Sequence, residues 1–285
     1  MCNAAINKTL ILLSLPLLLG SMSVTSCSGN GDKDKAEALL SEATTACDAG
    51  KYELALSLTD SLKRAYPEQI DTRRKGLHIT AKATEGLTLR NLERADSTLA
   101  VLGERGDSLS HLVKWVNNPI EGYYVAAGAS AAPVSSATGL YARVSPGGDF
   151  YLISVLKSPA VKSTSVTVSC GADQASTATV AHDGERNDRS MGAEVITFIG
   201  SECDDAGRFI ADHAGQPVKV TFNGQRSHSA TLSSTQAAEI ATLYNYATTV
   251  REAKIAAIEK TKLERMLDTA RSQAARTFVE PDSVK

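Results

Sequence analysis

The longest uninterrupted pattern in this sequence lies near its C-terminus. No glycine or proline occurs from Ser233 to Phe278, and the stretch opens with Ser233-Ser234-Thr235-Gln236, a capping-box pattern. Apolar residues recur there at helical spacing, so the segment predicts one helix of about 45 residues and about 68 Å. A lone helix of that length leaves its apolar stripe in water, so it needs a packing partner.

A second long helical pattern, from Asp71 to Val116, has nearly the same length. We expect the two segments to run antiparallel as a stalk within one chain, the alternative being the same helix of another copy. Gly103 and Gly106 punctuate the first segment, and a short helical stripe is expected from Leu109 to Val116. If the partner covers the long helix, Ile258→Asp should destabilise the monomer by roughly 2–5 kcal/mol. The apolar side chains expected to be covered are Ile255, Ile258, Leu263, Met266 and Leu267.

The segment between them, residues 120–232, alternates apolar and polar residues as strands do. Pro146-Gly147-Gly148 and Asn223-Gly224 are turn signals between such strands. About seven or eight short strands predict an antiparallel sandwich or barrel, which we expect to fold cooperatively on its own. The expected fold class is therefore α+β: a helical hairpin and a long antiparallel helical stalk with an inserted antiparallel β-sandwich or barrel domain.

Two amphipathic stripes precede the stalk and meet at Gly50. With Pro67 as the closing proline, Ala43 and Ala55 occupy the two small packing positions where helices meet closely. In these positions the segment resembles a single tetratricopeptide (TPR) repeat. The resemblance covers about 35 residues and implies a helical hairpin rather than a peptide-binding groove, because about three repeats are needed for an independent solenoid.

The N-terminal residues have the pattern of an export signal. Lys8 precedes an apolar run from Leu10 to Gly20, which at about eleven residues is too short to span a bilayer as a helix. Small residues then lead to a cysteine, in Val24-Thr25-Ser26-Cys27. This pattern resembles the lipobox of bacterial lipoproteins, and the whole chain looks like the lipoproteins of Gram-negative envelopes.

The lipoprotein resemblance implies cleavage before Cys27, lipidation of that cysteine, and the membrane as a partner through its lipid. Two or more acyl chains anchor a protein stably, because each buried CH₂ adds about 0.8 kcal/mol. Ser28 after the cysteine favours the outer membrane in the enterobacterial sorting pattern. The expected localisation is the cell envelope, lipid-anchored to the outer membrane, with periplasmic and surface-facing orientations both open.

These patterns divide the chain into segments with different roles. They are a lipoprotein signal peptide (1–26), a tether (27–35), the TPR-like hairpin and helical segment (36–118), the β-domain (120–232) and a C-terminal helix packing on the N-terminal helices (233–280). The formal net charge is -2, from 30 Lys and Arg against 32 Asp and Glu. A dedicated nucleic-acid binder is therefore not expected.

Three cysteines remain in the mature chain, and the sequence contains no C-x-x-C motif. An odd number in an oxidising compartment leaves at least one thiol free. Cys47 falls on the apolar face of a predicted helix, where a buried small side chain is expected. Cys170 and Cys203 both lie in the strand-rich segment, so a disulfide is one possibility, and two separate buried thiols are the expectation.

The sequence contains no G-x-S-x-G, H-E-x-x-H, P-loop or Rossmann glycine pattern. The acidic loops 182–188 and 202–205 match no calcium-loop pattern, and solvated turns explain them. Arg105-Gly106-Asp107 spells the tripeptide that integrins read, but helix-end residues also explain it. We assign no catalytic, cofactor or metal residues. The candidates for stacking on sugars, of which most are expected in the β-core, are Tyr123, Tyr124, Tyr141, Phe150, Tyr151, Phe198 and Phe222.

Three functional hypotheses follow from these features. The first is a non-enzymatic envelope lipoprotein with a structural or protein-interaction role, in which the stalk presents the β-domain to another envelope protein. The alternative is a lipoprotein that binds a glycan or peptide for nutrient uptake, and exposed aromatic residues on one β-face would favour it. A hydrolase is the third, and clustered carboxylates in a cleft would favour that role.

Overall fold

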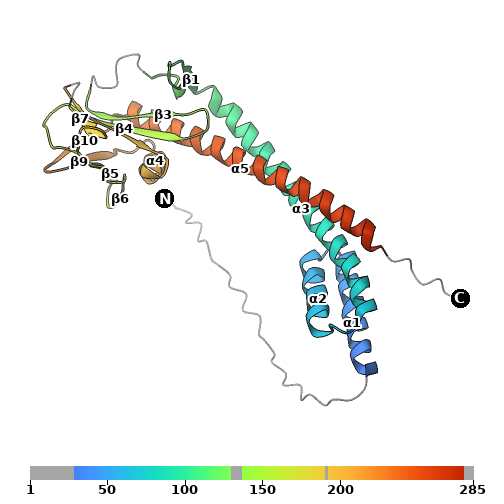
Figure 1. Cartoon of the computed structure of the whole chain (residues 1–285). Coiled ribbons are helices and arrows are strands. Elements are labelled where there is room, and N and C mark those ends of the chain that lie inside the picture. Colours follow the sequence, from blue (N-terminus) through green and yellow to red (C-terminus); the bar gives the residue numbers. More distant parts are fainter. Residues whose placement is uncertain (1–28, 130–136, 190–191, 279–285) are drawn as a thin grey trace, which may run out of the picture.

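The computed structural model describes residues 29–129, 137–189 and 192–278. Long helices form one end of the molecule and β-sheets form the other (Figure 1). This mixture of helices and antiparallel strands confirms the α+β class. The helices are α1 (Gly29–Asp48), α2 (Tyr52–Ala65), α3 (Ile70–Ser110), α4 (Asp204–Asp212) and α5 (Ser234–Thr277), with a 3-10 turn, η2 (Gly200–Glu202).

Helices α3 and α5 lie side by side along the stalk (Figure 1). Lys260 Nζ lies 2.6 Å from Asp96 Oδ1, and Arg271 Nε lies 3.1 Å from Glu85 Oε1. Later residues of α5 thus meet earlier residues of α3, so the two helices run antiparallel. The long C-terminal helix therefore packs on a segment of the same chain, as expected.

The partner covers only part of the apolar surface that the sequence assigned to it. Leu263 and Leu267 are buried, whereas the exposed fractions of Ile255, Ile258 and Met266 are 67%, 63% and 42%. The expected burial of those three side chains is wrong, which removes the reason for expecting Ile258→Asp to destabilise the chain. A single partner helix covers one stripe of α5, and these three side chains lie beside that stripe.

Helix α3 also differs from the expected pattern at its C-terminal end. It continues through Gly103 and Gly106, because packing along α5 outweighs the cost of about 1 kcal/mol for each helical glycine. The stripe expected to be helical up to Val116 is instead strand β1 (Val113–Val116), which pairs with β2 (Tyr123–Ala126). The 105–107 tripeptide therefore lies within a helix.

Helices α1 and α2 form the expected hairpin, and α3 packs against both. Its small core is built from Ala46, Cys47, Ala55 and Ala83. Helix α1 begins at Gly29, so residues of the segment expected to be a tether are part of this helix. The first residue of α1 and the last of α5 both lie at the end of the stalk opposite the sheets (Figure 1).

The described strands form two open antiparallel sheets and no closed barrel. One is six-stranded, in the order β1-β2-β3-β4-β8-β7, and the other four-stranded, in the order β10-β9-β5-β6. The remaining strands are β3 (Gly139–Val144), β4 (Phe150–Leu156), β5 (Ser165–Cys170), β6 (Asp173–Ser176), β7 (Asn187–Asp188), β8 (Glu194–Ile199), β9 (Lys219–Asn223) and β10 (Ser227–Thr231). Helix α4, which the sequence analysis did not predict, interrupts this strand-rich segment; its nine residues are too few for a clear helical pattern.

A single hydrophobic core joins both sheets to α4 and to the first half of α5. Phe150, Phe198 and Phe222 come from the strands and are fully buried. Ile240 and Leu243 of α5 are almost fully buried in the same core. The strand-rich segment 120–232 therefore does not contain all of its own core. Among the described helices, none is long and apolar enough to cross a membrane.

Candidate functional site

A row of three side chains crosses the outer face of the six-stranded sheet. Val144 and Phe150 point into the core, so their neighbours Arg143 and Tyr151 point outward and lie opposite each other in the β3–β4 register. Tyr123 of β2 completes the row. The Arg143 guanidinium carbon lies 5.1 Å from the ring centroid of Tyr123 and 4.9 Å from that of Tyr151. Both distances are within the range of cation–π attraction.

A shallow cavity of about 210 Å³ opens over this row. Polar groups from Asn118, Glu121 and Ser145 line it beside the two tyrosines. Ser145 belongs to the hairpin turn between β3 and β4, where its hydroxyl accepts hydrogen bonds from the backbone N–H groups of Gly147 and Asp149. The cavity therefore combines aromatic faces with hydrogen-bonding groups.

Helix α5 positions the hairpin turn beside this cavity. Gly148 has a φ of +87°, in the left-handed region that favours glycine. A Cβ atom at this position would lie 3.0 Å from Val250 Cγ1 and 3.1 Å from the carbonyl oxygen of Ala247. The turn thus rests directly on α5, which links the geometry of the site to the stalk.

The cavity carries charges of both signs. Arg143 makes no ion pair with any residue that the structure describes, and the carboxylates of Glu121 and Asp149 lie close enough to act on Tyr151. Burial raises the pKa of the Tyr151 hydroxyl, and these two carboxylates raise it further, while Arg143 lowers it by a smaller amount. The hydroxyl is therefore protonated at neutral pH and can donate a hydrogen bond. Such a site suits an uncharged polar ligand better than a strong anion.

The aromatic candidates divide between the core and this surface. Phe150, Phe198 and Phe222 are buried, and Tyr124 packs edge-to-face on Trp115 and Tyr246. Tyr123 and Tyr151 line the cavity, and Tyr141 lies on the same outer face, two residues from Arg143. Arg143 and Trp115 were not among the residues that the sequence singled out. Alternation along the predicted strand could have placed Arg143 on the outward face but not between two tyrosines, whereas Trp115 lay in a segment interpreted as helical.

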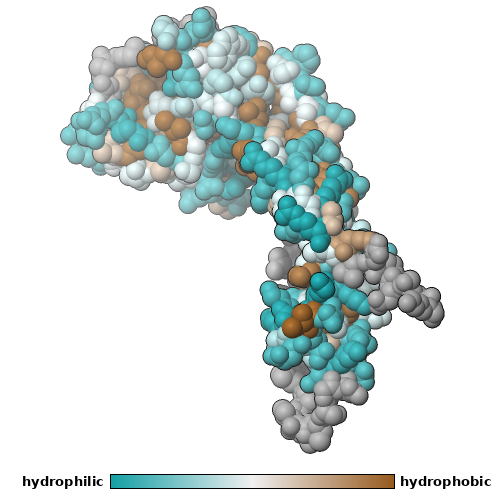
Figure 2. Space-filling view, turned by 45° about the vertical axis from the view of Figure 1, so that its right-hand side comes forward, coloured by the Kyte–Doolittle hydropathy of each residue, from teal (hydrophilic) through white to brown (hydrophobic). Residues whose placement is uncertain are grey.

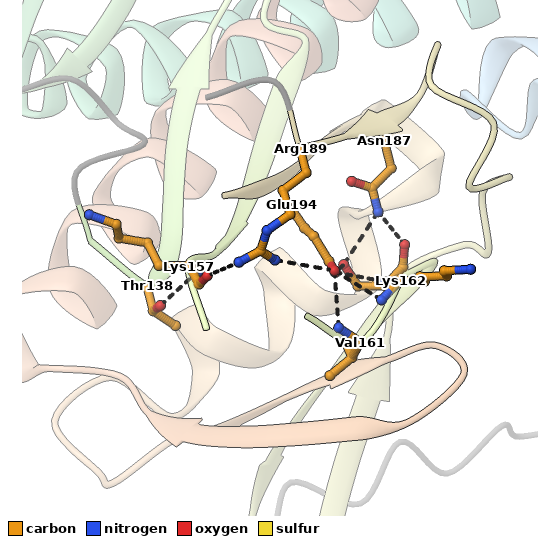
Figure 3. Close-up of polar contacts among 8 residues, drawn as sticks. Thr138, Lys157, Val161, Lys162, Asn187, Arg189 and Glu194 are labelled. Carbon is orange, nitrogen blue, oxygen red and sulfur yellow. Dashed lines mark hydrogen bonds and ion pairs between the residues drawn. The ribbon is translucent and has the colours of Figure 1, made fainter. Parts of the chain in front are cut away.

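A second polar cluster surrounds the buried carboxylate of Glu194, which is 2% exposed (Figure 3). It accepts hydrogen bonds from the backbone N–H groups of Val161, Lys162 and Ser163, at 3.0, 2.9 and 2.8 Å. Arg189 lies 3.5 Å from it as an ion partner. Burial alone would raise the pKa of Glu194, but the hydrogen bonds from Ser163, Lys162 and Val161 outweigh burial and lower it.

The Glu194 cluster has a structural explanation. Residues 161–163 belong to the segment that leads from β4 of one sheet to β5 of the other, and Lys162 has a φ of +52°. The ionised carboxylate satisfies the backbone donors of this bend (Figure 3). Asn187 donates a further hydrogen bond to the Ser163 carbonyl. The cluster therefore fixes the crossing between the two sheets.

The two acidic loops meet each other but form no metal site. Arg186 of the first loop donates a 2.8 Å hydrogen bond to Glu202 of the second, and this bond is the main cause of the lowered pKa of Glu202. Asp204 pairs with both terminal nitrogens of Arg251 at 3.0 Å. No group of metal-ligating residues occurs among the residues that the structure describes.

The described cysteines are all free thiols, so Cys170 and Cys203 form no disulfide. Burial raises the pKa of Cys203 to about 12, which makes it an unreactive core residue. Cys47 is buried in the hairpin core, as its position on the helix predicted. Cys27, the predicted lipidation site, lies outside the described residues, as does the signal peptide.

Comparison with known proteins gives no relative from which a function could be transferred. No family model matches the sequence, no curated protein matches it, and no solved structure matches the fold. Function must therefore be inferred from the residues and geometry of this chain.

Proposed function

We propose that this chain is a non-enzymatic lipoprotein of a Gram-negative cell envelope, anchored in the outer membrane through lipid on Cys27. Its role is structural or one of protein interaction: the stalk holds the sheets away from the membrane, where another envelope protein binds them. The lipobox resemblance at Val24-Thr25-Ser26-Cys27 supports the anchor. We infer further that the two sheets form a sandwich, because their inward-facing side chains share one core.

The direction of the helices is the observation that carries this proposal. Helix α1 begins at Gly29, shortly after Cys27, and its first residue lies at the end of the stalk opposite the sheets (Figure 1). Helix α3 has 41 residues and therefore spans about 60 Å. A lipid at Cys27 would thus be separated from the outer face of the six-stranded sheet by the length of the stalk.

Lipidation is tested by labelling cells that express the full chain with a palmitate analogue. The wild-type protein should carry the label and fractionate with outer membranes, whereas Cys27→Ser should do neither. Cys2→Ser is the matched control, because Cys2 lies in the segment that cleavage removes. A Cys27→Ser protein that still carried the label and sedimented with membranes would overturn the anchor.

The row Tyr123, Arg143 and Tyr151 favours a second candidate function, the binding of a glycan. Tyrosine faces cover apolar ring surface, and the adjacent guanidinium, amide and carboxylate can hydrogen-bond to hydroxyl groups. The cavity of about 210 Å³ is smaller than the roughly 300–1,000 Å³ of typical small-molecule sites. It would therefore hold one ring of an uncharged sugar chain.

The chain contains a single tryptophan that can report on this site. Trp115 is about half-exposed, and its ring covers Gly122, which lines the cavity. Titration with neutral oligosaccharides should change the emission of Trp115 in the wild-type protein, and Tyr151→Ala should abolish the change. Tyr141→Ala, on the same face outside the row, is the control. No change with any neutral glycan, or an equal change in Tyr151→Ala, would exclude this function.

A further inference from the structure

One side of the stalk carries an open trough between α3 and α5, with a volume of about 550 Å³. Helix α3 contributes Arg94, Thr98 and Leu102 to one wall, and α5 contributes Glu252, Ile255 and Glu259 to the other. Ile255 is 67% exposed there. Figure 2 shows one face of the molecule, on which the surface of the helical part is mostly hydrophilic and carries a few hydrophobic side chains. Exposed apolar side chains of this kind often mark an interface.

The two walls of the trough carry opposite charges. Arg94 is on the α3 wall, and Glu252 and Glu259 are on the α5 wall. Within the part of the chain that the structure describes, neither Arg94 nor Glu252 makes an ion pair. Glu259 has only an exposed pair, 3.4 Å from Lys262 on its own helix. These charges are therefore free to select a partner with the reverse arrangement.

We propose that the partner is a second copy of this chain, joined through this trough by a two-fold axis parallel to the stalk. Such an axis places α3 of each copy against α5 of the other, so each basic wall meets an acidic wall. A two-fold axis across the stalk would instead place α3 on α3 and α5 on α5, with like charges facing each other. The charge pattern thus selects the parallel dimer.

The register of the stalk brings the charged residues of the two copies to the same height. The pairs Asp96–Lys260 and Glu85–Arg271 show which residues of the two helices lie level. By the same register Arg94 lies level with Lys262, three residues beyond Glu259, which is about 4.5 Å along the axis. Two long side chains span this offset, so Arg94 of each copy can pair with Glu259 of the second copy.

The parallel dimer would also bury the exposed Ile255 of the trough. Four helices, α3 and α5 from each copy, would enclose Ile255 and the partly buried Ala256, beside Leu102, which is already buried in the single chain, in the manner of a four-helix bundle. Both α1 helices would begin at the same end of the dimer, so two lipid anchors could enter one membrane. The pairing of basic and acidic walls does not require the lipid anchor.

The test uses the mature chain, residues 27–285 with Cys27→Ser, in sedimentation equilibrium up to about 100 µM. We expect a monomer–dimer equilibrium. Arg94→Glu places like charges against each other at two symmetric positions and should raise the dimer dissociation constant at least about tenfold. Combining Arg94→Glu with Glu259→Arg should restore the wild-type value. Arg265→Glu, an equal charge change outside the trough, should leave it unchanged.

Ile255→Asp provides a second measurement at a position where unfolding is not expected, because its side chain is largely exposed. It should weaken the dimer while leaving the circular dichroism spectrum unchanged. A chain that stays monomeric at every concentration would overturn the proposal. A dimer unaffected by Arg94→Glu and Ile255→Asp would overturn the trough as its interface. Failure of the double charge exchange to restore the dimer would overturn the parallel pairing.

Discussion

In the sheets, Phe150, Phe198 and Phe222 have no exposed surface, whereas in the stalk part of α5 the exposed fractions of Ile255 and Ile258 are 67% and 63%. The two sheets, α4 and the start of α5 pack around one shared core, so the side chains that point into this core are buried. The stalk is two helices wide and covers only the stripe between them. The first region stabilises the chain, and the second leaves surface available for binding.

The same helix belongs to both regions. In its first half α5 contributes Ile240 and Leu243 to the β-core, and in its second half it contributes Leu263 and Leu267 to the stalk. The boundary between the two regions therefore lies within α5 and not at its N-cap, Ser233. Changes on either side of this boundary distinguish the two kinds of stabilisation.

The largest expected effect comes from separating the sheets from α5. A fragment of residues 120–232 lacks Ile240 and Leu243, and each such side chain contributes about 1.5–3 kcal/mol when buried. We expect it to show no cooperative transition in calorimetry, contrary to the sequence-based expectation. A fragment of residues 113–250, which restores β1 and the core-facing turns of α5, is the control and should melt cooperatively. Cooperative melting of the shorter fragment would show that the shared core is dispensable.

A smaller effect compares two positions within the stalk half of α5. Leu263→Ala removes a buried side chain and should lower the free energy of unfolding by about 2–3 kcal/mol, at the low end for large-to-small core changes because the stalk can close the gap. Ile258→Ala, at a largely exposed position outside the trough, should change it by less than about 0.5 kcal/mol. Urea unfolding of both variants measures the difference. An equal loss in the free energy of unfolding for the two variants would mean that both sides of the helix are covered.

The smallest effect concerns the crossing between the sheets. Glu194→Gln places an amide where three backbone donors need acceptors, and should cost about 1–3 kcal/mol at pH 7. Glu185→Gln, at an exposed position, is the control and should cost almost nothing. Urea unfolding of the two variants measures both values. A neutral Glu194→Gln would show that the crossing does not need the charge.

The same carboxyl group makes stability depend on pH. Because the folded-state pKa of Glu194 is lowered, its contribution is complete above the unfolded value of about 4.3 and is lost as the pH falls through the folded value. The wild-type protein should therefore lose more stability than Glu194→Gln between neutral and acidic pH. If the free energy of unfolding changed with pH by the same amount in the two proteins, the assignment to Glu194 would be contradicted.

The alternation of apolar and polar residues along the strands predicted only part of the candidate site. The Pro146-Gly147-Gly148 turn and the strands on both sides of it were predicted, and Tyr123 and Tyr151 were among the aromatic candidates. Arg143 gains its role from the register of β3 against β4 and from the adjacent β2, which a single sequence does not specify. Trp115 was missed because a four-residue strand following a long helix carries too little periodicity.

By itself, the sequence determined that the N-terminal and C-terminal segments are helical, that the middle segment is rich in strands, and that α5 needs a packing partner. These features follow from periodicity and turn residues, which act locally and can be read along the chain. Only the tertiary structure decided which stripe of α5 is covered, that its first half completes the β-core, and that Arg143 lies between two tyrosines. These features depend on contacts between residues far apart in the chain. Several such arrangements satisfy the same local sequence pattern, and the simultaneous packing of all the side chains selects one of them.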